Sequence, residues 1–228
     1  MYFSLRLRPA DRPDLLRYQA HMENDMEPIK DLQGLRQVLG EPRPLTYFKI
    51  HQKLNAKAQD FIRHSPLMML STANSKGEST VSPKGDMPGF VIIGDERTIF
   101  IPERTGNKLI FSFQNILENS NVGLLFMVPG THETLRIRGR AELTAEPGLC
   151  QKMASRGKPA LMVMVVKITE AYFHCAKAFL RSSVWQPESW PEKIKISFGE
   201  EIACNSDMSE GEIRKLDAGV DERYKTDL

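Results

Sequence analysis

The chain has 228 residues, of which 41% are hydrophobic and 26% charged, a composition that is ordinary for a globular protein with a sizeable core. Its 31 basic and 29 acidic residues leave a net charge of +2, which gives no reason to expect nucleic acid or a membrane as a partner. No apolar run approaches the ~20 residues that cross a bilayer, and the three cysteines are too far apart for a disulfide framework or a zinc knuckle, so we expect a cytoplasmic protein without a metal site.

Residues 1–64 are predicted to form a mainly helical extension packed on the rest of the chain. Residues 1–10 alternate roughly, which indicates a strand. A first helix follows, and its apolar face consists of Leu32, Leu35, Val38 and Leu39. After a break at residues 40–44, a second helix is predicted from Tyr47 to about Arg63.

From Leu67 onward the apolar residues follow the period of strands. Extended segments are predicted at residues 67–72, 79–84, 89–93, 98–102, 122–128, 134–144 and 161–168. The clearest is 134–144, where apolar or small residues alternate strictly with polar ones. Short strands at such close spacing indicate an antiparallel meander or barrel.

A helix is predicted to interrupt these strands after residue 105. Its apolar residues repeat at helical spacing, and they are Leu109, Ile110, Phe113, Ile116 and Leu117. Thr105 or a neighbour would cap this helix, which places Lys108 in its first turn. A short helix is predicted around residues 147–153, and short helical pieces and loops beyond Tyr172.

The segment from Phe100 to Lys108 carries the clearest chemical signal. It reads as a strand, then a loop, then the start of a helix, where free backbone N–H groups suit an anion. Arg104 and Lys108 add charge, Asn107 adds amide donors, and Gly106 lets a ligand approach the backbone. A phosphate monoester is the ligand that best matches these donors and charges. The alternative is a solvated, capped helix with ordinary surface Lys and Arg.

Several pieces of the chain together resemble the pyridoxamine 5'-phosphate oxidase-like family of FMN-binding split barrels. They are Ser82–Asp86, Gly106–Lys108, Asn115–Asn119, Val122–Phe126 and Thr134–Ala141, and residues 174–177 resemble a subgroup of probable FMN-dependent enzymes of unassigned substrate. The resemblance implies a mainly β (α+β) fold, a six-stranded antiparallel split β-barrel with flanking helices. The barrel would span residues 65–175. Residues 176–228 would complete the cleft or the interface of a homodimer that binds FMN between its subunits.

The resemblance also implies a set of cofactor-binding residues. Ser79, Thr80, Val81, Ser82, Pro83 and Lys84 would line the flavin, Ile101 and Pro102 would lie under it, and Thr134 would contact its ring. Asn107 and Lys108 would hold the phosphate where the oxidases have an Arg-Lys pair, and Arg104 would supply the missing charge.

Simple electrostatics adds two more candidates, Arg136 and Arg181, and a second role for Lys84. A cation near N1 and the C2 carbonyl of the flavin would raise its reduction potential, and Lys84, Arg136 and Arg181 are candidates for that role. Trp185 would stack near the flavin. The alternatives are a solvated sheet face paired with Glu142 for Arg136, and a core or interface position for the tryptophan.

We therefore expect an FMN-dependent oxidoreductase acting on a small substrate, with catalytic residues that the sequence does not identify. Residues 221–228 lack the Arg-x-His motif of the true oxidases, so oxidation of pyridoxamine phosphate itself is not expected. The alternatives are a non-enzymatic protein that stores or senses flavin or haem, with His132 or His174 as the haem ligand, a deazaflavin-dependent reductase, and a structural dimer with an empty cleft. The cysteines are expected not to be catalytic, and a packed pair is favoured for His174 and Cys175.

Overall fold

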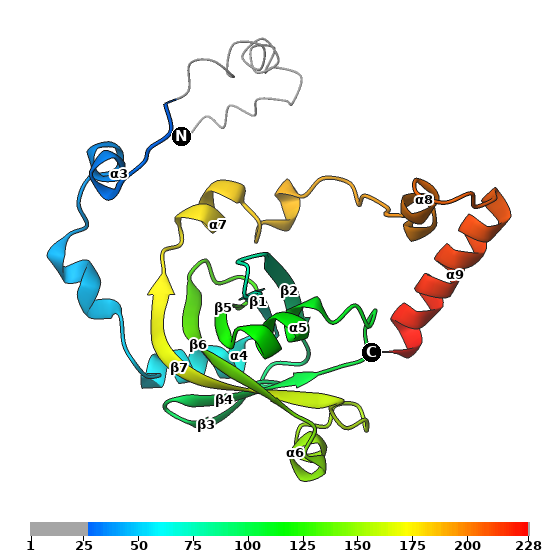
Figure 1. Ribbon diagram of the computed structural model, residues 1–228, viewed down its shortest axis with the longest axis horizontal. Coiled ribbons are helices and arrows are strands. Elements are labelled where there is room, and N and C mark those ends of the chain that lie inside the picture. The colour runs from blue at the N-terminus through cyan, green and yellow to red at the C-terminus, as the bar shows by residue number, and fades with distance from the viewer. Residues whose placement is uncertain (1–26, 228) are drawn as a thin grey trace. The chain divides into compact units, whose positions relative to one another are not determined.

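The computed structural model describes residues 27–227, so the strand expected at residues 1–10 lies outside the described part (Figure 1). The chain divides into two units, residues 1–46 and 47–228. In the first, helix α3 (Leu32–Leu39) begins at Asp31, whose side chain accepts a hydrogen bond from the Gly34 N–H. It ends at Gly40, where φ is 73°. None of its residues is buried, and the packing of this extension on the barrel stays a prediction.

The helix expected from Tyr47 to Arg63 is interrupted. A 3₁₀ helix, η2 (Pro44–Lys49), is followed by an extended stretch and then by α4 (Ala56–His64), which buries Ala58 and Ile62. The interruption has a tertiary cause, because the backbone of His51 pairs with that of Ala171, on a strand that is far away in the sequence. Asn55 then starts α4 by accepting a hydrogen bond from the Ala58 N–H.

Seven strands form one antiparallel sheet in the order β2-β1-β5-β6-β7-β4-β3. They are β1 (Leu67–Ala73), β2 (Ser79–Gly85), β3 (Ile92–Asp95), β4 (Thr98–Glu103), β5 (Asn121–Met127), β6 (Thr134–Thr144) and β7 (Met162–His174). The family resemblance implies six strands, whereas the residue pattern predicts seven extended segments. The one predicted at residues 89–93 corresponds to the short β3, which starts three residues later and pairs only with β4 at the sheet's edge.

Strand β6 has the predicted bounds and the predicted faces. Leu135, Ile137 and Ala141 are buried, whereas Arg138 and Arg140 are exposed. Strand β7 extends six residues beyond its expected end at residue 168, because residues 170–174 pair with residues 134–138 of β6.

A glycine marks the irregularity between β6 and β7. At Gly139 the register shifts, and a Cβ atom there would lie 2.5 Å from the carbonyl oxygen of Lys167. Only glycine lets the two strands approach this closely.

The main core lies inside the curled sheet. Its fully buried side chains come from most strands and from α4, and they include Ile62, Leu70, Ile99, Phe126, Leu135 and Val166. Helix α5 (Phe111–Glu118) lies against β1 and β2. It carries Ile116 into this core, while Leu109, Ile110 and Leu117 of the predicted apolar face are exposed.

The remaining helices are α6 (Pro147–Lys152), α7 (Lys177–Ser182), the 3₁₀ helix η3 (Pro187–Ser189), α8 (Phe198–Ala203) and α9 (Glu210–Thr226). The last two pack on each other, since Asp217 of α9 accepts hydrogen bonds from the Ser197 hydroxyl and the Gly199 N–H. Among residues 27–227, no helix combines the length and apolar character that crossing a membrane requires.

Candidate functional site

Helix α5 starts later than the sequence predicts. It begins at Phe111 after Ile110, which has a left-handed backbone with φ of 50° and makes no side-chain cap. Lys108 is also left-handed, with φ of 62°. Such dihedrals cannot continue a right-handed helix. The predictions that Lys108 lies in the first helical turn and that Thr105 or a neighbour caps the helix are therefore wrong, and Lys108 lies in an exposed loop.

The six residues predicted on β2 divide between two faces. Thr80, Ser82 and Lys84 are half-buried and face α5, whereas Ser79, Val81 and Pro83 point to the exposed side. This is the period of two that any strand imposes. Half of the predicted set therefore forms one surface, which we call the inner face of β2 (Thr80, Ser82 and Lys84).

Hydroxyl and amide groups join the inner face of β2 to α5. The Ser82 hydroxyl lies 2.8 Å from that of Ser112, and the Thr80 hydroxyl lies 2.9 Å from that of Thr72. The buried Asn115 donates to Thr72 at 3.1 Å and to Thr80 at 3.4 Å. These bonds fix the orientation of the strand relative to the helix.

Lys84 is the only charged residue of this inner face. Its Nζ lies 2.5 Å from the Glu103 carboxylate and 4.7 Å from the centre of the Phe113 ring. Its side chain is only 15% exposed. The strands β2 and β4 do not pair with each other, so this ion pair connects two parts of the sheet that backbone hydrogen bonds leave separate.

The loop of residues 104–110 is held against the inner face of β2 at both ends. Before it, Glu103 binds Lys84, and after it, Ser112 contacts Ser82. The loop itself is mostly exposed, and a side chain added at Gly106 would meet nothing within 4 Å. The fold therefore brings together the two sequence segments predicted to bind the flavin.

Arg104 is engaged elsewhere. Its Nε donates to Asp86 at 3.0 Å, and its Nη1 is buried without a hydrogen-bond partner among the described residues. Asp86 also accepts hydrogen bonds from the Ser155 hydroxyl and the Met87 N–H. Burial raises the pKa of Asp86, but the hydrogen bonds from Met87, Ser155 and Arg104 outweigh it and hold that pKa below its ordinary value. Arg104 thus already has a partner for its charge.

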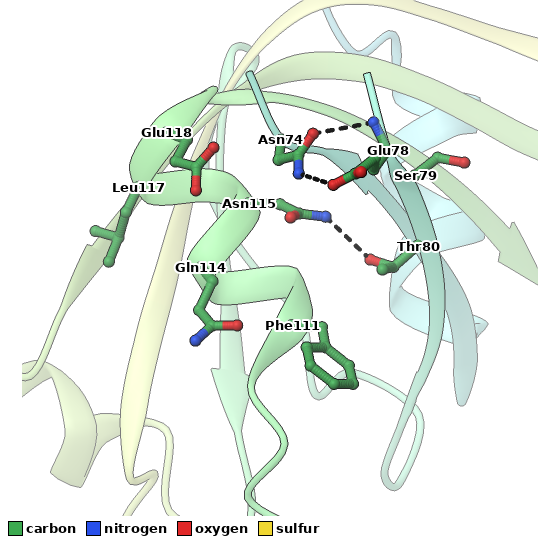
Figure 2. A pocket seen from close by; sticks show the side chains of 9 residues that line it. All are labelled: Asn74, Glu78, Ser79, Thr80, Phe111, Gln114, Asn115, Leu117 and Glu118. Carbon is green, nitrogen blue, oxygen red and sulfur yellow. Dashed lines mark hydrogen bonds between the residues drawn. The ribbon is translucent and has the colours of Figure 1, made fainter. Parts of the chain in front are cut away.

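Two cavities adjoin these residues. One of about 540 Å³ lies between the β1–β2 hairpin and α5, and Figure 2 shows Asn115 reaching across it to Thr80. Its lining includes Glu78 and Glu118 and neither Lys nor Arg, so it does not suit a phosphate. The other, of about 210 Å³, is lined by Arg104, Asp86 and Ser155 among others.

Two predicted residues are buried on β4. They are Ile101 and Pro102, and Ile101 belongs to the main core. Their predicted position under the flavin stays a prediction.

The other predicted residues lie near the start of β6 and in the segment after β7. Thr134 is buried opposite His174, and Arg136 donates to the Tyr172 hydroxyl at 3.0 Å. Trp185 donates to the Thr131 carbonyl and stacks on Phe179, while Arg181 on α7 is exposed. Among residues 27–227, no hydrogen bond or ion pair joins these residues to the inner face of β2 or to the loop.

The histidines and cysteines form no shared site in the part of the chain that the structure describes. No group of three or more His, Cys, Asp or Glu side chains could hold a metal ion there. His132 and His174 are half-buried. Cys150 is buried, whereas Cys175 and Cys204 are exposed, so the packing expected for Cys175 is wrong.

Sequence reasoning missed Glu103, Ser112 and Asp86. Asp86 could have been identified from the sequence, because it stands two residues after Lys84 in one of the segments that carry the family resemblance. Glu103 directly follows the strand predicted at residues 98–102, but its partner Lys84 is 19 residues away on a strand that does not pair with β4. No local pattern encodes that contact.

Comparisons with known proteins agree with this architecture. The profile of the family described as pyridoxamine 5'-phosphate oxidase matches residues 54–175, which is more than half of the chain. No curated protein matches the chain.

Solved structures similar to the chain include HupZ of Group A Streptococcus, which is 21% identical over 53% of this chain and 93% of its own, with a TM-score of 0.44. An FMN-binding protein from Syntrophomonas wolfei is 13% identical over 63% of this chain and 97% of its own, with a TM-score of 0.36. A NimC/NimA family protein from Clostridium acetobutylicum is 19% identical over 53% and 87%, with a TM-score of 0.35. At such identities and TM-scores, nothing about activity transfers to this chain.

Proposed function

Since the chain belongs to the pyridoxamine 5'-phosphate oxidase family, we propose that it is an FMN-dependent oxidoreductase acting on a small substrate. The family and the single antiparallel sheet confirm the predicted α+β split-barrel fold. Members of this family typically bind a flavin.

The observation that carries this proposal is the placement of the loop at residues 104–110. It runs beside the inner face of β2, so a polar strand and an exposed loop with a lysine lie next to each other. FMN has a polar ring edge, a hydroxylated chain and a dianionic phosphate. The donors present, namely hydroxyls, a lysine ammonium and open backbone at Gly106, match those groups in kind.

Lys108 is the residue that we propose to hold the phosphate. Of the three predicted cations near the loop, Lys84 and Arg104 are paired with Glu103 and Asp86, whereas no ion pair within residues 27–227 involves Lys108. A residue other than glycine in a left-handed conformation is strained, and such strain often marks a binding site. Asn107 would add amide donors. Arg104 would contribute only the electrostatic attraction of a more distant positive charge.

Bound FMN would supply the redox chemistry, exchanging a hydride or an electron pair with the substrate. The protein's residues would bind and orient it. Thr80 and Ser82 would offer hydroxyls to the flavin, and Ile101 and Pro102 would support it from below. Residues 105–110 would cover it from solvent, since Leu109 and Ile110 expose apolar side chains there.

We further propose that the complete site needs two copies of the chain. Among residues 27–227, no hydrogen bond or ion pair joins Thr134, Arg136, Arg181 or Trp185 to the loop of the same chain, and we propose that in a homodimer they face the loop of the partner. Residues 176–228 would then complete the cleft or the interface. Leu109, Ile110 and Phe111 expose more than half of their side chains, as expected for residues covered by a second subunit.

Sedimentation with FMN present tests the dimer. We expect a species of twice 25.9 kDa at micromolar protein, because stable dimers bury more than roughly 1,200 Å². A flavin-loaded monomer would contradict it.

The absorption spectrum of the protein as purified from the cytoplasm of an expressing cell tests the function itself. The flavin bands of FMN, with the cofactor identified by mass after release, support the proposal. A haem spectrum, a deazaflavin, or a colourless protein that fails to bind added FMN would each refute it. A haem spectrum would direct attention to His132 and His174.

A further inference from the structure

The ion pair of Lys84 and Glu103 has the shortest separation of any ion pair among residues 27–227, at 2.5 Å. The two side chains are 15% and 23% exposed, and the face of the Phe113 ring covers the ammonium group. Partial burial weakens solvent screening, so each charge strongly offsets the other.

This ion pair results from the fold and not from a local sequence pattern. Glu103 is the last residue of β4 and Lys84 stands near the end of β2, and these strands do not pair. Pro102 before Glu103 is buried, which fixes the point where the carboxylate emerges. Glu103 is therefore held at the inner face of β2, where the flavin is proposed to bind.

We propose that Glu103 lowers the reduction potential of bound FMN by neutralising Lys84. This inference rests on the proposed function. When a substrate donates a hydride, it loses two electrons and one hydrogen nucleus, and the flavin ring gains one negative charge near N1 and the C2 carbonyl. A free ammonium group nearby would favour that charge, but a neutral ion pair presents only a dipole, whose field falls off faster with distance. Glu103 thus keeps the flavin a weaker oxidant than Lys84 alone would make it.

The test compares the potential of bound FMN in four proteins, namely the wild type, Glu103→Gln, Glu170→Gln, and the double variant Lys84→Met with Glu103→Gln. Glu170 is the matched control, because it pairs with Arg138 at 3.7 Å and its side chain is 27% exposed. Its substitution removes the same charge away from Lys84. FMN affinity is measured first by fluorescence quenching, and potentials are then read at saturating FMN by titration with dithionite against a reference dye.

We expect Glu103→Gln to shift the equilibrium toward reduced flavin at least tenfold, which is about 30 mV for a two-electron couple. Glu170→Gln should leave the potential unchanged, and the double variant should not show the rise. An unchanged potential in Glu103→Gln with FMN bound refutes the inference and leaves the proposed function intact, as does a rise that persists without Lys84. Failure of the wild type to bind FMN refutes the proposed function and this inference with it. Thermal unfolding checks that Glu103→Gln is folded, and Glu103→Asn replaces it if it is not.

Discussion

Replacing Lys108 by glycine separates what this residue costs the fold from what it contributes to binding. A left-handed backbone costs a residue other than glycine roughly 1–2 kcal/mol, and φ at Lys108 is 62°. Glycine removes that cost but loses about 0.5–1 kcal/mol more backbone entropy on folding. Lys108→Gly should therefore raise the free energy of unfolding of the flavin-free protein by about 0.5–1 kcal/mol.

The same substitution should weaken FMN binding. A charge-assisted hydrogen bond from Lys108 to the phosphate is worth about 1.5–3 kcal/mol, and each 1.4 kcal/mol is tenfold in affinity, so the dissociation constant should rise roughly tenfold to a hundredfold. Lys108→Ala should lose as much FMN affinity without the gain in stability, because alanine keeps the unfavourable backbone. Riboflavin lacks the phosphate and should bind all three proteins equally weakly.

Fluorescence quenching measures both ligands, and urea unfolding without flavin measures the stability. If FMN affinity is unchanged, or if riboflavin loses as much as FMN does, Lys108 does not hold the phosphate. If Lys108→Gly and Lys108→Ala have the same free energy of unfolding, the left-handed backbone at residue 108 costs the fold nothing, and this reasoning is refuted.

Two further predictions concern groups beside the site. Because hydrogen bonds and Arg104 hold the pKa of Asp86 below its ordinary value, its carboxylate stabilises the fold above the ordinary pKa of about 3.9, and this contribution is lost as the pH falls through the folded-state pKa. Asp86→Asn should cost about 1–3 kcal/mol at pH 7, and its deficit in unfolding free energy should shrink on acidification, whereas a deficit that stays constant from pH 7 to pH 3 would contradict the pairing. Replacing Cys150, Cys175 and Cys204 together by alanine should leave FMN affinity unchanged, and loss of flavin from folded Cys175→Ala alone would show a role for that thiol.

The sheet was predictable where one residue pattern sufficed. In β6, alternation alone gave the correct bounds and, apart from the buried Thr134 at its start, the correct faces, because Leu135, Ile137 and Ala141 are buried and the exposed residues are polar. The same period divides the six residues of β2 into two faces, so the half that faces α5 was also implicit in the sequence.

Local backbone conformation was not predictable in the loop before α5. Glycine and asparagine at residues 106 and 107 look like the start of a helix, whereas the left-handed residues are Lys108 and Ile110. Lysine and isoleucine rarely adopt that conformation, and isoleucine is β-branched, so sequence preference points away from what the fold imposes. The interrupted helix after Tyr47 has a similar origin, since its break depends on the distant Ala171.

The charge of the candidate site depends on contacts that no short segment reveals. The sequence shows three cations there, Lys84, Arg104 and Lys108, and suggests a strongly positive cleft. Folding places Glu103 on the first and Asp86 on the second, across strands that share no hydrogen bonds. The proposed phosphate would then meet one unneutralised lysine, and the flavin ring would meet a neutral pair. Under the proposed function, phosphate affinity and reduction potential would depend on separate residues, so a substitution at Lys108 should change the first and a substitution at Glu103 the second.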